Sequence, residues 1–375
     1  MVRYDTSHSF LGERFAVTYR ISQPYEEAKK IAELLVVEQT IEFPSELVGK
    51  RIKSYVIGRI ESMQYTDRAT FVKVSYSVEI TGNELTQFFN VVMGNVSLIP
   101  GIKVVDLELS PSLKSFLPGP RFGVEGLREI LGVKERPLIA TAIKPMGLTS
   151  EELAEMAYKL AKGGVDIIKD DHGLADQDFS PFAERVSKVL KAVDKANQET
   201  GGKTLYAPNV TANESTMMKR ALIAKEMGVK ALLVAPALVG FGSVQLLSQE
   251  VGLPILSHPA FLGGYLSIAT HRVLFGLWQR LIGADVSIFP NHGGRFTFSL
   301  DECRESVRGT HEPFAWLRPI LPSPAGGMSV DKVKQMVNLY GNDVLLLIGG
   351  ALHRMSADLE KSARIFKEEV ERARL

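Results

Sequence analysis

From Pro137 onward the chain repeats one pattern eight times, and this repeat constrains the fold more than any other feature. Each repeat has a short segment rich in Val, Ile and Leu, then a polar or Gly-rich loop, and in most cases a stretch with helical spacing. Continuous apolar runs of this length are typical of parallel strands buried on both faces. The eight segments are 137–145, 165–171, 204–210, 231–238, 254–259, 285–291, 319–327 and 344–350.

The stretches between these segments carry helix start and stop signals. The helix expected after the first segment has Thr149 or Ser150 as its cap and ends at Gly163–Gly164. A later one is expected between Ser329 and Gly341. Eight strand–helix units predict a (β/α)8 TIM barrel. The competing interpretation, a doubly wound open sheet, normally shows Gly-x-Gly-x-x-Gly after the first strand, and this sequence lacks it there.

Residues 1–118 have a different pattern. The stretches "RFAVTYRIS" and "ATFVKVSYSVEI" alternate apolar and polar residues, as half-buried antiparallel strands do, while "YEEAKKIAELLVVEQ" and "ELTQFFNVVMG" have helical spacing. We therefore expect a small N-terminal α+β domain of ferredoxin-like type. Pro118, Gly119 and Pro120 mark the expected junction, so the barrel domain would span 119–375.

Charge and cysteine content exclude several classes of protein. The formal net charge is +1 and no run of five like charges occurs, so we expect neither a nucleic-acid nor a membrane partner. The one cysteine, Cys303, excludes a disulfide framework and a cysteine-based metal cage. The first residues lack the apolar core of a signal peptide, and no apolar run is long enough to span a bilayer. These features favour a cytoplasmic protein.

Polar or glycine-rich residues follow seven of the eight expected strands. In a TIM barrel these positions share the rim where active sites lie, so we expect a site there. The strand-end residues are Lys144, the run Lys169–Asp170–Asp171–His172, Asn209, Ser257–His258, the run Asn291–His292–Gly293–Gly294–Arg295, Gly326–Gly327 and Gly349–Gly350.

Two of these groups point to specific chemistry. Because strand side chains alternate, Lys169 and Asp171 share a face and Asp170 points away. A buried Lys–Asp pair could be a plain ion pair, but the other polar strand ends favour a catalytic role. The glycine pairs Gly326–Gly327 and Gly349–Gly350 could be only turn residues. Their occurrence after strands seven and eight favours phosphate binding, because those loops form the usual phosphate site of barrels.

These motifs resemble the large subunit of ribulose-bisphosphate carboxylase/oxygenase (RuBisCO), and most closely the RuBisCO-like proteins. "TAIKPMGLTS" is similar to the family's Lys-Pro-Lys motif on strand one, and "GGVDIIKDDHG" to its Gly-Gly-x-Asp-x-x-Lys-Asp-Asp-Glu motif on strand two. "SHPA" stands where the family has His-Arg-Ala, and "NHGGRF" in its mobile loop after strand six. "PAGGM" and "LLIGGAL" resemble its two phosphate-binding segments. The resemblance covers nearly the whole chain.

The resemblance implies roles for individual residues. Lys169 would react with CO2 to form a carbamate and, with Asp171, would bind Mg2+ or another divalent ion. Such an ion polarises a carbonyl and stabilises an enediolate. The carbamate or Lys144 would move the proton, and His258 would hold or protonate a substrate hydroxyl. Arg295 and the two glycine pairs would contact the phosphorylated substrate.

The resemblance also implies a homodimer or an assembly of dimers. Glu38 in "VVEQT" and Asn95 in "VMGNV" lie in segments similar to those with which the family reaches the neighbouring subunit's active site. In that case one chain alone would hold an incomplete site.

Several positions depart from the family pattern. His172 replaces the third acidic metal ligand, so either it binds a different metal or a substrate oxygen or water takes that place. Met146 replaces the second strand-one lysine. Pro259 and Ile288 replace an arginine and a histidine that serve the second phosphate of a bisphosphate. Arg295 replaces the mobile-loop lysine that stabilises added CO2.

Together the departures favour an enzyme that forms an enediolate from a monophosphorylated keto-sugar or sugar-acid derivative. A proton shift, as in isomerases and enolases of methylthioribulose-type phosphates, is one outcome. Decarboxylation, or carboxyl transfer with hydrolysis, of a 3-oxo sugar-acid phosphate is the other, and the sequence leaves both open. An authentic ribulose-bisphosphate carboxylase and a non-catalytic barrel are the less favoured alternatives.

Overall fold

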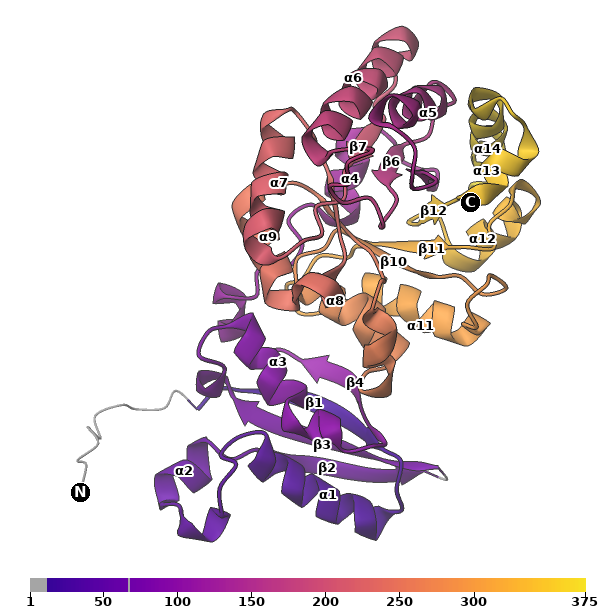
Figure 1. Ribbon diagram of the computed structural model, residues 1–375. Coiled ribbons are helices and arrows are strands. Elements are labelled where there is room, and N and C mark those ends of the chain that lie inside the picture. The colour runs from indigo at the N-terminus through magenta and orange to yellow at the C-terminus, as the bar shows by residue number, and fades with distance from the viewer. Residues whose placement is uncertain (1–11, 67) are drawn as a thin grey trace. The chain divides into compact units, whose positions relative to one another are not determined.

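The computed structural model describes residues 12–66 and 68–375, which divide into two compact units (Figure 1). One unit holds the described residues up to Pro118 together with Tyr265–Val273 and Phe314–Trp316. The other holds Gly119–Gly264, Leu274–Pro313 and Leu317–Leu375. Within the described residues, no helix combines the length and apolarity needed to cross a membrane.

The described part of the larger unit contains an eight-stranded parallel barrel, as the repeat predicts. The strands lie in the order β7-β6-β5-β12-β11-β10-β9-β8. A parallel bridge between Asn209 and Leu233 joins the two end strands and closes the barrel. The strands are β5 (Leu138–Ile143), β6 (Ile167–Asp170), β7 (Leu205–Ala207), β8 (Leu232–Val234), β9 (Ile255–Ser257), β10 (Val286–Pro290), β11 (Leu321–Ala325) and β12 (Leu345–Leu347).

Helices follow most of the strands. The helix α5 (Ser150–Lys162) begins as predicted, because Thr149 caps it and forms a capping box with Glu152. The others in this unit are α4 (Gly123–Leu131), α6 (Phe182–Thr200), α7 (Glu214–Glu226), α8 (Pro236–Val239), α9 (Phe241–Val251), α10 (Trp278–Leu281), α11 (Leu300–His311), α12 (Val333–Tyr340), α13 (Gly350–Met355) and α14 (Leu359–Ala373).

Each strand is shorter than the apolar segment from which it was predicted, and two further features differ from the sequence-based expectation. The apolar segment 231–238 is only partly a strand, because Pro236 begins the short helix α8. The helix expected from Ser329 begins with a 3-10 turn at Val330–Lys332 before α12. Both differences fall in loops, so the barrel itself is unaffected.

Apolar side chains that alternate along the strands fill the barrel. Leu138, Ile167, Leu256 and Ile288 belong to one buried cluster inside it. At the start of β10, Asp285 ties three elements together: its carboxylate accepts hydrogen bonds from the backbone N–H groups of Phe122 (2.9 Å), Gly123 (2.7 Å) and Ile255 (2.9 Å). This packing leaves the carboxyl ends of the strands as the rim that carries the polar side chains.

The smaller unit is an antiparallel sheet with helices, in agreement with the predicted α+β pattern. Its strand order is β2-β3-β1-β4. The phenols of Tyr19 and Tyr76 share a buried hydrogen bond of 2.9 Å in its core. The elements are β1 (Arg14–Ile21), β2 (Arg59–Thr66), β3 (Ala69–Ser77), β4 (Ile102–Glu108), α1 (Tyr25–Glu38), α2 (Lys50–Tyr55) and α3 (Leu85–Met93).

Candidate active site

Lys169 lies near the carboxyl end of β6 and is a buried charged group at the rim. Its side chain is almost inaccessible to solvent, and Nζ donates a hydrogen bond of 3.0 Å to the carbonyl oxygen of Asp170. Burial, opposed by the attraction of Asp171 and assisted by the charge of Lys144, lowers the pKa of Lys169 to about 8. A substantial fraction of the amine is therefore neutral near pH 8, as a nucleophile or base requires.

Asp171 lies among three nitrogen-bearing side chains. Its Oδ1 is 4.0 Å from Lys144 Nζ and 3.7 Å from His172 Nδ1. Partial burial raises the pKa of Asp171, but the interaction with His172 and the positive charge of Lys169 outweigh this and hold it well below its usual range. The carboxylate is thus ionised at all physiological pH values.

His258, just after β9, is held as a neutral imidazole. Its ring stacks on that of His172 with centroids 4.3 Å apart and planes at 9°. Burial, followed by the charges of Lys169 and His172, lowers the pKa of His258 to about 2. Its Nδ1 accepts a hydrogen bond of 3.1 Å from the backbone N–H of Ala260, so the neutral ring carries its proton on Nε2. His258 can therefore donate to a substrate oxygen through Nε2 and keep no net charge.

Asp170 points away from these groups, as strand alternation predicts. Its carboxylate is fully buried and accepts hydrogen bonds from Arg185 Nε (3.1 Å), the Tyr206 hydroxyl (2.7 Å) and the Asn209 backbone N–H (3.0 Å). Sequence reasoning missed this cluster, because its members come from β6, α6, β7 and the loop beyond β7. A buried acid next to a predicted site, which needs a partner, is the signal that could have found it.

The two glycine pairs lie at the same rim. A Cβ on Gly326 or Gly350 would enter open space, while one on Gly349 would lie 3.5 Å from Lys144 Nζ. Gly327 has a φ of +66°, and a Cβ there would lie 2.9 Å from Gly294 Cα. The loop after β10 therefore rests directly on the loop after β11, and the open glycine backbones lie beside a lysine.

The remaining predicted residues lie in two places. Arg295 is exposed in the loop after β10, with its guanidinium 5.2 Å from the centre of the Phe296 ring. Glu38 and Asn95 are brought together in the smaller unit, where Asn95 Nδ2 donates a hydrogen bond of 3.0 Å to Glu38 Oε1. This pair is thus an ordered polar feature of that unit.

The positions that depart from the RuBisCO pattern have distinct surroundings. Ile288 is buried in the barrel core, where a charged phosphate ligand would be costly. Met146 is half-exposed at the rim, and a Cβ on Gly173 would overlap its terminal methyl group. Met146 therefore packs against the backbone of the loop that carries His172.

The donor set around Lys169 fits a divalent ion only with additional oxygen ligands. Across residues 12–66 and 68–375, no group of three or more His, Cys, Asp or Glu side chains is arranged to hold a metal. Here Asp171 supplies carboxylate oxygens and His172 an imidazole, while Lys169 supplies an amine. Addition of CO2 to that amine would turn it into an oxygen ligand of the kind that Mg2+ prefers.

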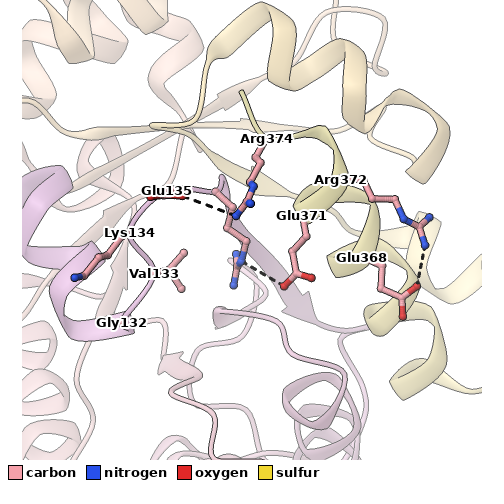
Figure 2. A pocket seen from close by; sticks show the side chains of 9 residues that line it. Gly132, Val133, Lys134, Glu135, Glu368, Glu371, Arg372 and Arg374 are labelled. Atoms are coloured by element: carbon pink, nitrogen blue, oxygen red, sulfur yellow. Dashed lines mark ion pairs between the residues drawn. The ribbon is translucent and has the colours of Figure 1, made fainter.

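A separate pocket lies at the opposite end of the barrel, where the residues before β5 approach α14 (Figure 2). Most of its charged side chains are paired: Arg136 with Glu371 (3.9 Å) and with Asp166 (2.7 Å), Arg374 with Glu135 (3.8 Å) and Arg372 with Glu368 (3.6 Å). The pairs of Arg136 with Glu371 and of Arg374 with Glu135 join the loop before β5 to the C-terminal end of the chain. In barrels that face serves stability, whereas the opposite rim carries the chemistry.

Comparison with known proteins places the chain in a family. Residues 123–288 match the family described as "Ribulose bisphosphate carboxylase large chain, catalytic domain". The chain is 39% identical to "Ribulose bisphosphate carboxylase-like protein 1" of Rhodopseudomonas palustris, over 96% of this chain and 98% of that protein. It is 36% identical to the "5-methylthioribulose-1-phosphate isomerase" of Rhodospirillum rubrum, over 91% of each.

More distant relatives and a solved structure agree with this. The "2,3-diketo-5-methylthiopentyl-1-phosphate enolase" of Bacillus licheniformis is 32% identical over 90% of this chain and 86% of that protein. The crystal structure of a Rubisco-like protein from Rhodopseudomonas palustris superposes with a TM-score of 0.87 at 38% identity, covering 96% of this chain and 97% of that one. The predicted fold and the prediction of an isomerase- or enolase-type enzyme are thereby confirmed. The chain belongs to the RuBisCO large-chain family and, within it, to the RuBisCO-like proteins.

Proposed function

We propose that the protein moves a proton at the carbon next to the carbonyl of a monophosphorylated ketose or diketone. The observation that carries this proposal is the buried amine of Lys169, whose pKa is lowered to about 8 next to Asp171. The neutral form of this amine is the one that can add CO2, and an oxygen of the resulting carbamate, or Lys144, can then take the proton. The first substrate to test is 5-methylthioribulose 1-phosphate, because a relative that aligns with 91% of this chain is named for it.

In this proposal the side chains and backbone amides at the rim have separate roles. Lys144 and, through a carbamate oxygen, Lys169 are the candidate bases, and His258 donates from Nε2 to the oxygen that becomes more negative as the proton leaves. The glycine pairs at 326–327 and 349–350 offer backbone N–H groups to the phosphate. A single phosphate fits, because the positions that serve a second one are Pro259 and the buried Ile288.

Lys169 as a carbamate, Asp171 and His172 would hold the divalent ion, which when bound withdraws electrons from the substrate carbonyl. Asp171 stays ionised for this purpose. His172 is the least typical member of the set, since imidazole is a weaker ligand for Mg2+ than carboxylate is.

Glu38 and Asn95 are proposed to complete the site of a neighbouring copy. Their hydrogen bond fixes the direction of the Asn95 amide in the smaller unit. Mixing Glu38→Gln with Lys169→Met, each inactive alone, tests this. Recovery of activity on mixing supports a shared site. A mixture that is no more active than the two separate variants contradicts it, and so does a fully active monomer in light scattering.

Proton exchange tests the proposed chemistry directly. Wild-type enzyme with 5-methylthioribulose 1-phosphate, Mg2+ and bicarbonate in D2O should place deuterium next to the carbonyl, as seen by NMR. Lys169→Met should abolish the exchange, while Lys159→Met, an exposed lysine paired with Glu155 on α5, should not. Release of CO2 from a 3-oxo sugar-acid phosphate without deuterium uptake would favour the decarboxylase instead. Exchange that survives in Lys169→Met would remove this residue from the mechanism.

A further inference from the structure

We infer that Asn209 is a positioning residue, which fixes the loop bearing Asp171 and His172 from the end of the neighbouring strand β7. The expected effect on catalysis rests on the proposed function, whereas the expected effect on the position of the loop does not. Asn209 follows β7 and is 2% exposed.

The orientation of the Asn209 amide is determined by its neighbours. Oδ1 accepts hydrogen bonds from the Thr211 backbone N–H (3.1 Å) and the Thr211 hydroxyl (2.6 Å). Because a backbone N–H can only donate, the oxygen must face Thr211 and the NH2 group must face the other way. Nδ2 then donates to the carbonyl oxygens of His172 and Leu174, both at 2.9 Å.

The same loop is held at a second place by Arg185. Its Nη2 donates to the carbonyl oxygen of Ala175 (2.8 Å) and its Nη1 to that of Ser180 (2.6 Å). Arg185 and the backbone of Asn209 both bind the same buried carboxylate oxygen of Asp170. The side chains of Asn209 and Arg185 thus bind four carbonyl groups of the loop, and both residues also bind the Asp170 carboxylate.

The consequence for the site follows from where Asn209 acts. The residue whose carbonyl it binds is His172, whose ring stacks on His258 and whose Nδ1 approaches Asp171. Without the two hydrogen bonds from Asn209, the orientation of the peptide group after His172 is no longer fixed. The His172 ring and the Asp171 carboxylate then no longer keep their positions relative to His258. Positioning errors near 1 Å lower a rate by about a hundredfold.

The variant should still fold, because backbone bonds close the barrel at this point. Leu233 N–H donates to Pro208 O and Val210 N–H donates to Leu233 O, both at 2.9 Å. The chain also offers a matched control at the other end of β7. There Asn197 Nδ2 donates to Thr204 O and Asn197 Oδ1 accepts from Thr204 N–H, both at 2.9 Å.

The experiment compares Asn209→Ala and Asn197→Ala in the full-length protein. Without substrate, hydrogen–deuterium exchange of residues 171–180 should be at least about tenfold faster in Asn209→Ala only. With 13C-labelled histidine, the His172 resonance, identified by its loss in His172→Gln, should lose the ring-current shift of the stacked pair. With 5-methylthioribulose 1-phosphate, kcat should fall about a hundredfold while KM stays within about twofold.

Each outcome decides the inference. Unchanged exchange and an unchanged His172 resonance in Asn209→Ala overturn it, and so do equal effects in Asn197→Ala. If Asn209→Ala does not fold, Asn209→Asp, which keeps the volume and the acceptor but lacks both donors, replaces it and is judged by the same measurements. If the wild-type protein does not turn over the substrate, the proposed function fails, while exchange and NMR still decide the role of Asn209.

Discussion

Replacing Lys169 with methionine should abolish activity and at the same time stabilise the fold at neutral pH. Methionine has a similar length and no charge, so it fits the same buried space. The ammonium is disfavoured there, since burial lowers the pKa from 10.5 to about 8. At about 1.36 kcal/mol for each pKa unit, keeping the charge inside the fold costs about 3 kcal/mol.

The net gain is smaller than this cost. The variant loses the hydrogen bond from Nζ to the Asp170 carbonyl, which contributes about 1 kcal/mol. Lys169→Met should therefore raise the free energy of unfolding by about 2 kcal/mol at pH 7. Guanidinium denaturation followed by circular dichroism, in buffers free of CO2, measures this difference.

The pH dependence provides an independent check. Between pH 8 and 10 the folded wild-type protein has released a proton that the unfolded chain keeps, so its stability rises with pH. The methionine variant lacks this contribution, and its advantage should shrink and then reverse. Unfolded tyrosines also ionise near pH 10, but both proteins share them and the difference cancels. A variant less stable than wild type at pH 7, with a gap that does not change up to pH 10, would refute the reasoning.

Three further predictions concern the barrel and its rim. Asp285→Ala leaves three backbone N–H groups without their acceptor and should lower the free energy of unfolding by about 3–5 kcal/mol, measured by the same denaturation. Gly327→Ala should weaken binding of inorganic phosphate on the order of tenfold in a 31P NMR titration, because its Cβ would press on Gly294, whereas Gly341→Ala, with a similar φ of +79° but open space, should not. The His258 imidazole should show no titration between pH 5 and 8 by NMR, since its pKa is lowered to about 2; a midpoint near 6.5 would contradict its burial among cations.

The barrel could be predicted from the sequence because its signals are local and repeated. Eight apolar runs predicted the strand number, and the polar or glycine residues that end seven of them predicted the rim. The capping box at Thr149 fixed the start of α5. Strand β8 was predicted too long, since an apolar run does not by itself distinguish a strand from the helix that Pro236 begins.

The site could be predicted only where adjacent residues carry the information. Alternation along one strand placed Lys169 and Asp171 on one face and Asp170 on the other. The contacts between separate elements could not be obtained in this way. Nothing local pairs Asp170 with Arg185 on α6, or the Asn209 amide with the His172 carbonyl, because these depend on how far each loop bends back. The stacking of His172 on His258 joins residues 86 positions apart and has the same origin.

The two neighbouring carboxylates at the end of β6, Asp170 in the strand and Asp171 just after it, determine where this scaffold can accept mutations. Asp171 faces the reacting groups, whereas Asp170 is anchored outside the barrel wall by Arg185, Tyr206 and Asn209. Mutations on the inner side can therefore alter the reaction while the outer anchor preserves the shape of the loop. His172, whose side chain is half-exposed although its carbonyl is tied down, is the position where new chemistry can be introduced with the smallest structural disturbance. Directed evolution toward other phosphorylated substrates should begin there and leave Asp170 untouched.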